Sequence, residues 1–214
     1  MTERFAIYFA PARDSRLAER AEAWLAQPEL EALTVSARRY GFHATLKAPM
    51  GLAPGVARAQ LEAALAEFAG RSAAVELALA PRLLGGFVAL TAEPQPQAVT
   101  DFAADVVVAF EPLRAPLGAA ETARRLGAPL SARQIELVER YGYPYVLDEF
   151  LFHMTLTDYL AEAQRAAMQA RAVAWFADAL ATPVTLDRLV LFHEAEPGAA
   201  FRRLDDYLLK GASP

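Results

Sequence analysis

The chain contains no cysteine among its 214 residues. This absence excludes disulfide bonds, thiolate zinc sites and cysteine nucleophiles, and it fits a reducing compartment. Long apolar runs are also missing: no segment approaches the roughly 20 apolar residues of a membrane span, and the N-terminal "MTERFAIYFAPARDS" has no apolar run of signal-peptide length. We therefore expect a cytoplasmic protein with no membrane association.

An excess of positive charge is missing as well. Lysine and arginine number 21 against 26 aspartates and glutamates, which gives a net charge of −5. A long nucleic acid would meet no overall attraction, so it is not an expected partner, and any phosphate binding must be local. The hydrophobic fraction of 55% is high enough to fill a proper core.

Histidine is scarce, and two of the three histidines stand in matching settings. The segments "RYGFHATLKAP" (39–49) and "EFLFHMTLTDY" (149–159) share the pattern Phe-His-x-Thr-Leu. Successive side chains of a strand point to opposite faces, so every second residue shares a face. The polar residues on these faces are His43, Thr45 and Lys47 in the first segment and His153, Thr155 and Thr157 in the second.

The elements expected around the two motifs repeat along the chain. Apolar periodicity and turn residues predict that a helix and then two strands follow the first motif strand. The same order of elements is predicted after the second motif strand, whose histidine lies 110 residues after that of the first. A Pro- and Arg-containing stretch, 114–146, precedes the second motif strand, which we expect over 150–160. This order indicates an internal duplication.

Two imidazoles and two hydroxyls brought together suit one kind of chemistry. A neutral imidazole takes a proton from water or a sugar hydroxyl, and an imidazolium gives one to a leaving alkoxide near neutral pH. Threonine hydroxyls and the Lys47 ammonium donate hydrogen bonds to phosphoryl oxygens, where charge builds in the transition state. Phosphodiester cleavage needs this set and no metal.

The paired H-x-T motifs resemble those of the two-histidine (2H) phosphoesterase superfamily, which includes cyclic nucleotide phosphodiesterases. The extended forms "RRYGFHATLKAP" and "RYGYPYVLDEFLFHMTLT" are similar to a bacterial branch often encoded beside carbon–phosphorus lyase and phosphonate-utilisation genes. The resemblance implies a catalytic pair, His43 and His153, with Thr45 and Thr155 binding the phosphate. It also implies an α+β fold: a duplicated, bilobed chain with two antiparallel sheets lining a central cleft and helices outside.

We expect one bilobed domain over 1–214, with sequence halves near 1–111 and 112–214 and elements swapped between the lobes. The predicted enzyme is a metal-independent phosphodiesterase with no cofactor, acting on a small cyclic or nucleotide-like phosphate ester, in phosphonate utilisation by the resemblance. A monomer is favoured. The further predicted substrate contacts are Lys47, Arg39, Tyr40, Thr157 and Tyr143.

Several alternatives stay open at the level of sequence. Arg39 and Tyr40 before the first motif, and Arg140 and Tyr143 before the second, fit a surface role as well as a place in the cleft. His193 has an alanine two residues on and is expected to be structural. The rival functions are a phosphoryl-ligand or RNA-binding module without turnover, and a metallohydrolase, which is weakened because neither motif offers a close pair of histidine ligands.

Overall fold

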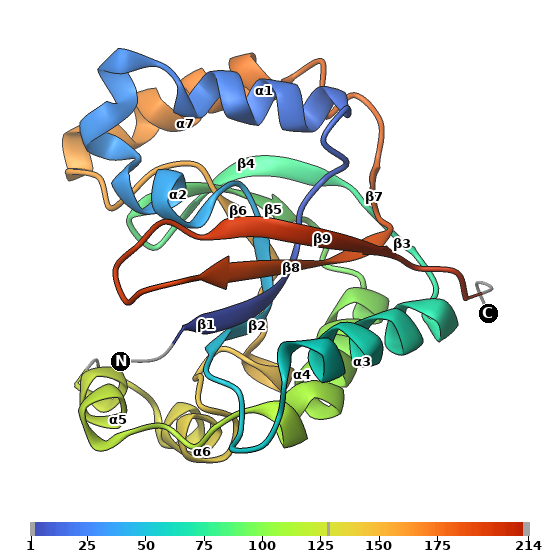
Figure 1. Ribbon diagram of the computed structural model, residues 1–214. Helices are drawn as coiled ribbons and strands as arrows, with labels where there is room; N and C mark the ends of the chain where they lie inside the picture. The colour runs from blue at the N-terminus through green and yellow to red at the C-terminus, as the bar shows by residue number, and fades with distance from the viewer. Residues whose placement is uncertain (1–2, 128, 212–214) are drawn as a thin grey trace.

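A computed structural model describes residues 3–127 and 129–211 as an α+β protein whose antiparallel sheets carry helices on their outer sides (Figure 1). This confirms the predicted fold class. The strands are β1 (Arg4–Phe9), β2 (Ala44–Met50), β3 (Val75–Leu77), β4 (Leu79–Leu84), β5 (Phe87–Ala92), β6 (His153–Thr155), β7 (Val184–Leu186), β8 (Arg188–Glu194) and β9 (Arg202–Leu208). The α-helices are α1 (Arg16–Leu25), α2 (Val35–Tyr40), α3 (Arg58–Arg71), α4 (Gln97–Phe110), α5 (Ala119–Leu126), α6 (Ala132–Tyr141) and α7 (Glu162–Phe176). None of the helices in this part of the chain combines the length and apolar composition that crossing a membrane requires.

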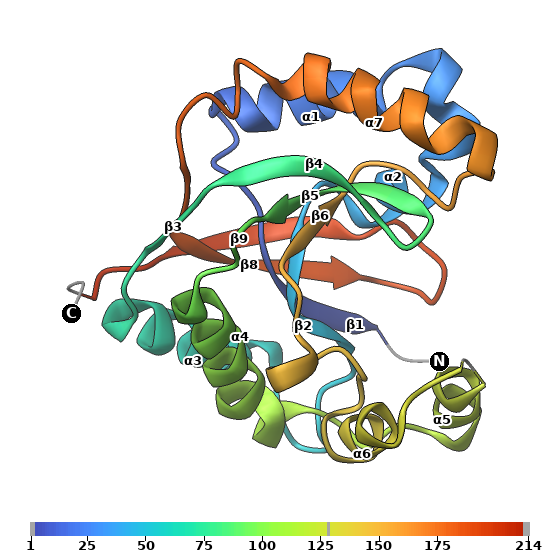
Figure 2. The same ribbon diagram turned by 180° about the vertical axis from the view of Figure 1, so that it is seen from behind.

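Both larger sheets mix strands from the two halves of the sequence. The four-stranded sheet has the order β2-β1-β8-β9, and the three-stranded sheet has the order β4-β5-β6. The motif strands β2 and β6 lie beside each other where these sheets meet (Figure 2). Residues separated by more than a hundred positions in the chain are thereby brought together.

The same order of elements follows both motif strands. α3, β3, β4 and β5 follow β2, and α7, β7, β8 and β9 follow β6. The corresponding short strands β3 and β7 pair with each other in antiparallel fashion. This repeated order supports the internal duplication, while the division of the chain near residue 111 stays a prediction.

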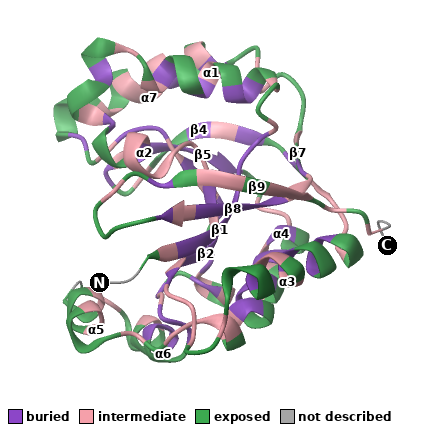
Figure 3. Ribbon diagram, in the orientation of Figure 1, coloured by how far each residue is buried: buried purple, intermediate pink, exposed green. Residues whose placement is uncertain are grey.

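The helices cover the sheets on opposite sides of the molecule. α1 and α7 lie above the three-stranded sheet in Figure 1, and α3 and α4 lie against the four-stranded sheet. Each of these four helices has buried residues on one side and exposed residues on the other (Figure 3). Fully buried Leu61 and Leu65 of α3 lie four residues apart on such a stripe, and burial of each stabilises the fold by about 1.5–3 kcal/mol.

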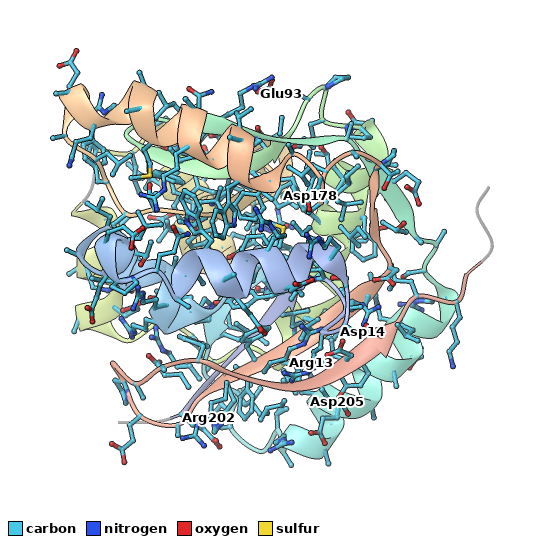
Figure 4. All side chains as sticks on the ribbon, turned by 90° about the horizontal axis from the view of Figure 1, so that it is seen from above. Arg13, Asp14, Glu93, Asp178, Arg202 and Asp205 are labelled. Carbon is cyan, nitrogen blue, oxygen red and sulfur yellow. The ribbon has the colours of Figure 1, made fainter. Side chains whose placement is uncertain are left out.

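Local sequence explains how α1 begins and where it packs. Ser15 is its N-cap, and the serine side chain accepts a hydrogen bond from the Ala18 amide at 3.2 Å. The indole of buried Trp24 donates to the carbonyl of Leu156, just beyond β6, at 2.9 Å. Asp178, labelled in Figure 4, lies after α7. Its carboxylate accepts a hydrogen bond from Arg16 at the start of α1 at 2.7 Å, which joins the two helices.

The structure differs from the sequence-based elements around the second motif. The strand expected over 150–160 is hydrogen-bonded as a strand only from His153 to Thr155. The amides of Leu156 and Thr157 both donate to the carbonyl of Val88, so the regular ladder ends there. The stretch 114–146, to which no element was assigned, holds α5 and α6.

Candidate active site

The two motifs line one cavity of about 440 Å³ between the sheets. His43 lies directly before β2 and His153 begins β6, and Thr45 and Thr155 follow two residues later on the same faces. Cavities of this size accommodate small molecules. The further lining residues come from β1, α2, β2, α5 and the segments after α5 and α6: Arg4, Tyr8, Ser36, Tyr40, Ala48, Pro49, Arg124, Arg125, Leu130, Tyr143, Pro144 and Tyr145.

Both imidazoles are held by the same backbone contact. Nδ1 of His43 is 2.8 Å from the carbonyl oxygen of Gly41, and Nδ1 of His153 is 2.9 Å from that of Leu151. A carbonyl oxygen only accepts, so Nδ1 carries a proton in both rings and donates it. Nε2 is therefore the nitrogen that gains or loses a proton in each imidazole.

Gly41 makes the first of these contacts possible. Its backbone has φ 75° and ψ 169°, a conformation that is almost restricted to glycine. A Cβ at this position would also lie 3.3 Å from the Phe192 ring. The glycine of the first motif is thus required by the turn that aims its carbonyl at the His43 ring.

An aromatic ring supports each imidazole. Tyr8 stacks on His43 with the ring centroids 3.8 Å apart and the planes 21° from parallel. Phe87, on the strand next to β6, lies with its centroid 6.0 Å from His153. Together with the Nδ1 hydrogen bonds, these contacts fix the rings in position.

Burial keeps both imidazoles neutral. The pKa of His43 is lowered from 6.5 to about 4, chiefly by burial and to a smaller extent by the nearby His153, while the hydrogen bond to Gly41 opposes the shift. Burial also lowers the pKa of His153, against the opposing effect of its hydrogen bond to Leu151. In the free protein at neutral pH, both Nε2 atoms are therefore proton acceptors.

The hydroxyl group of Thr45 is close to one of these acceptors. Thr45 Oγ1 lies 3.2 Å from Nε2 of His43, so the hydroxyl donates to the neutral ring when no ligand is present. Thr155 pairs across the sheet with Ala89 and lines the cavity. Thr91 pairs with His153 in the same way, and its buried hydroxyl has no hydrogen-bond partner among the described residues.

Tyr40 and Tyr143, both predicted from sequence, line the cavity, although contact with a substrate stays a prediction. Tyr143 and Tyr145 meet edge to face with centroids 5.6 Å apart. Burial raises the pKa of the Tyr143 hydroxyl, so this group remains protonated and can donate a hydrogen bond. These rings form an apolar wall beside the histidines.

Lys47 does not line the cavity, so the geometry gives no support for its predicted phosphate contact. Tyr8 pairs with Thr45 and Ile7 with Lys47, so β2 has one extra residue at this step of the ladder. Such a β-bulge breaks the two-residue alternation and turns Lys47 toward the core face. Its side chain is 3% exposed, and its ammonium donates to the Val107 carbonyl at 3.0 Å and pairs with Glu111 at 2.5 Å.

Thr157 and Arg39 also differ from their predicted roles. Thr157 is fully buried beyond the end of β6, and its hydroxyl accepts from the Val88 amide at 3.0 Å. Arg39 pairs with the buried carboxylate of Glu194 at 2.6 Å and lines a neighbouring hollow instead of the histidine cavity. The side chains of both residues are therefore engaged within the fold.

His193 lies outside the cavity, in agreement with its expected structural role. Its ring stacks on Phe5 with centroids 4.9 Å apart, and Nε2 is 2.6 Å from Glu3 Oε2. Across residues 3–127 and 129–211, no three histidine or carboxylate side chains are grouped so that they could hold a metal ion. Independence from metal nevertheless stays a prediction for experiment.

Sequence reasoning missed three arginines of the cavity. Arg4 comes from β1, and Arg124 and Arg125 come from α5. Glu121 accepts hydrogen bonds from both α5 arginines, and these bonds lower its pKa to about 2. The Arg-Arg pair in the stretch 114–146 was the available signal, but no helix had been assigned there.

Comparisons with known proteins agree with this architecture. The family model described as "Protein of unknown function (DUF1045)" matches residues 45–202. A protein of Laribacter hongkongensis (strain HLHK9), named ribose 1,5-bisphosphate phosphokinase PhnN, is 38% identical over 227 residues, covering 98% of this chain and 53% of the relative. A protein of the same name from Janthinobacterium sp. (strain Marseille) is 39% identical over 221 residues, covering 92% and 49%.

The chain thus spans about half the length of the curated relatives that it matches. Among solved structures, TT0787 of Thermus thermophilus aligns over 98% of this chain and 100% of its own, with a TM-score of 0.53 and 15% identity. At this identity the likeness concerns the fold alone. Because the family model covers most of the chain, the protein belongs to the DUF1045 family.

Proposed function

We propose that this protein is a metal-independent phosphodiesterase that hydrolyses a small cyclic or nucleotide-like phosphate ester. The observation that carries the proposal is the matched pair of histidines in one cavity, each with Nδ1 held by a backbone carbonyl and each followed by a threonine. A cavity of about 440 Å³ supports a small substrate. The resemblance of the two motifs to those of the 2H phosphoesterase superfamily supports the same class of reaction.

In the proposed reaction, water attacks phosphorus while one phosphorus–oxygen ester bond breaks. One neutral imidazole takes the proton of the attacking water at Nε2, and the other, protonated, gives its Nε2 proton to the leaving oxygen. A P–O bond forms, a P–O bond breaks and one proton moves at each side, so the step balances. The hydroxyls of Thr45 and Thr155 donate to the non-bridging oxygens, where negative charge increases.

The lowered histidine pKa values explain how the acid acquires its proton. Both rings are neutral in the free protein, and two neighbouring imidazolium ions would repel each other. A bound phosphate anion raises the pKa of both rings, so that one proton is held in the complex. Either histidine can act as the acid or as the base, because each ring has Nδ1 held by a backbone carbonyl and exchanges protons at Nε2.

The names of the two relatives support a setting in the metabolism of phosphorylated sugars, since they state an activity on ribose 1,5-bisphosphate. We keep phosphonate utilisation, indicated by the branch that the motifs resemble, as the proposed biological context. A single bilobed domain and a monomeric state also remain proposals. Size-exclusion chromatography with light scattering measures the latter.

The test is hydrolysis of a panel of nucleoside 2′,3′- and 3′,5′-cyclic phosphates by the wild-type protein and by His43→Ala and His153→Ala. We expect turnover that both substitutions abolish with the fold intact. His193→Ala is the matched control, because this third histidine lies outside the cavity, and it should retain activity. Tight binding of the cyclic phosphates without turnover would instead support a non-catalytic phosphoryl-binding module.

A further inference from the structure

The histidine cavity opens into a second hollow that none of the proposed chemistry uses. This hollow has a volume of about 620 Å³ and shares Arg4, Tyr40, Pro49 and Arg124 with the histidine cavity. The two arginines therefore stand at the junction, with the H-x-T residues on one side. A ligand bound to the histidines and threonines would extend toward them.

Positive charge is concentrated at this junction. Four guanidinium groups lie around the two hollows, those of Arg4, Arg39, Arg124 and Arg125. Two carboxylates accompany them: Glu194 pairs with Arg4 and Arg39, and Glu121 pairs with the two arginines of α5. Two positive charges remain uncompensated, in a chain whose net charge is −5.

The ion pairs orient the arginines and leave donors for a ligand. Arg4 binds Glu194 through Nε, and neither of its terminal nitrogens donates to any group in the described part of the chain. Arg124 binds Glu121 through Nε and Nη2, and its Nη1 likewise has no partner among those residues. An arginine anchored at one edge and open at the other is suited to binding a phosphate.

We propose that the substrate carries, besides the ester that is cleaved, a terminal phosphate monoester that binds between Arg4 and Arg124. A phosphate monoester has a charge of about −1.5 to −2 at neutral pH, which matches the uncompensated charge at the junction. The inference rests on the proposed function, because the histidine cavity is taken to hold the scissile ester. The substrate class is then a phosphorylated sugar or nucleoside with a cyclic diester at one end and a phosphate at the other.

The test compares adenosine 2′,3′-cyclic monophosphate with its 5′-phosphorylated form, which differ only in the terminal phosphate. We expect wild-type kcat/KM to favour the 5′-phosphorylated form by about tenfold or more, the factor that one charge-assisted hydrogen bond contributes. Arg124→Gln should lower kcat/KM for the 5′-phosphorylated form by a much larger factor than for the unphosphorylated compound, and so remove most of this preference. Arg58→Gln is the matched control, since Arg58 is an exposed helical arginine with an intrahelical glutamate partner and does not line the cavity.

Two results would overturn the subsite. One is an equal kcat/KM of the wild-type protein for the two compounds. The other is an equal loss of kcat/KM for both compounds in Arg124→Gln, which would mean that this arginine acts on the scissile phosphate or stabilises the fold. Calorimetric binding of adenosine 3′,5′-bisphosphate and adenosine 3′-monophosphate repeats the comparison without turnover. If turnover depends on the histidines but shows no preference for the 5′-phosphorylated compound, the subsite is refuted and the proposed function is not. If binding shows a preference that depends on Arg124 but no turnover occurs, the proposed function is refuted and the subsite is not.

Discussion

The strongest quantitative consequence of the structure concerns the protonation of His43. Burial lowers its pKa from 6.5 in the unfolded chain to about 4 in the folded protein. As the pH falls through 6.5, the unfolded chain binds a proton that the folded protein does not bind until about pH 4. This residue therefore contributes a loss of stability as the pH falls from 6.5 to about 4, and no further change below that range.

The size of this loss follows from the shift. One pKa unit corresponds to about 1.36 kcal/mol, so His43 reduces the free energy of unfolding by about 2.5 kcal/mol between about pH 7.5 and about pH 4.5. Urea unfolding of the wild-type protein and of His43→Gln at both pH values isolates this contribution, because the carboxylates contribute equally to both proteins. The variant should gain about 2.5 kcal/mol relative to wild type at the lower pH.

The pKa itself can be read from the carbon-bound imidazole protons by NMR. The chain has only three histidines, so His43→Gln identifies the signal by its loss. Phosphate added to the wild-type protein should raise the pKa of both cavity histidines, because an anion between them stabilises the imidazolium form. A His43 signal that titrates near its ordinary pKa of 6.5, or a stability difference independent of pH, would refute the description of a buried, neutral imidazole.

Three further predictions test the remaining parts of the site. Thr45→Val or Thr155→Val should lower kcat by about 10²–10³, as removal of one transition-state donor does, and an unchanged kcat in steady-state assays would exclude that threonine from the reaction. Lys47→Met should lower the free energy of unfolding, measured with urea, by about 1–3 kcal/mol, because the Val107 carbonyl and Glu111 lose their buried partner. The variant should keep the wild-type KM, and a raised KM would show that Lys47 contacts the substrate. Thr91→Val should leave the free energy of unfolding equal or about 1 kcal/mol higher, because the hydroxyl that it removes has no partner among the described residues, and a clear destabilisation would reveal a hydrogen bond to bound water.

Local patterns in the sequence were sufficient for the faces of the two motif strands and for the helices that follow them. The alternation of side chains along a strand predicted that His43 and Thr45 share one face of the first motif strand and that His153 and Thr155 share one face of the second. Both of these faces line the cavity. Apolar spacing likewise predicted the helices that follow the two motif strands, α3 and α7. These features depend on neighbours within a few positions, so the sequence alone determined them.

Tertiary structure decided what depends on pairing between distant segments. The bulge that turns Lys47 into the core exists only because β2 pairs with β1 and has one extra residue in this pairing. The strand ladder ends before Thr157 because the Val88 carbonyl accepts hydrogen bonds from two successive amides. Arg4 and Arg124 meet at one junction although 120 positions separate them. The alternation of side chains along a strand gives no information about the pairing register or about bulges, and helical periodicity does not specify which end of a helix contacts which sheet. The positions of Lys47, Thr157, Arg4 and Arg124 were therefore decided by tertiary packing.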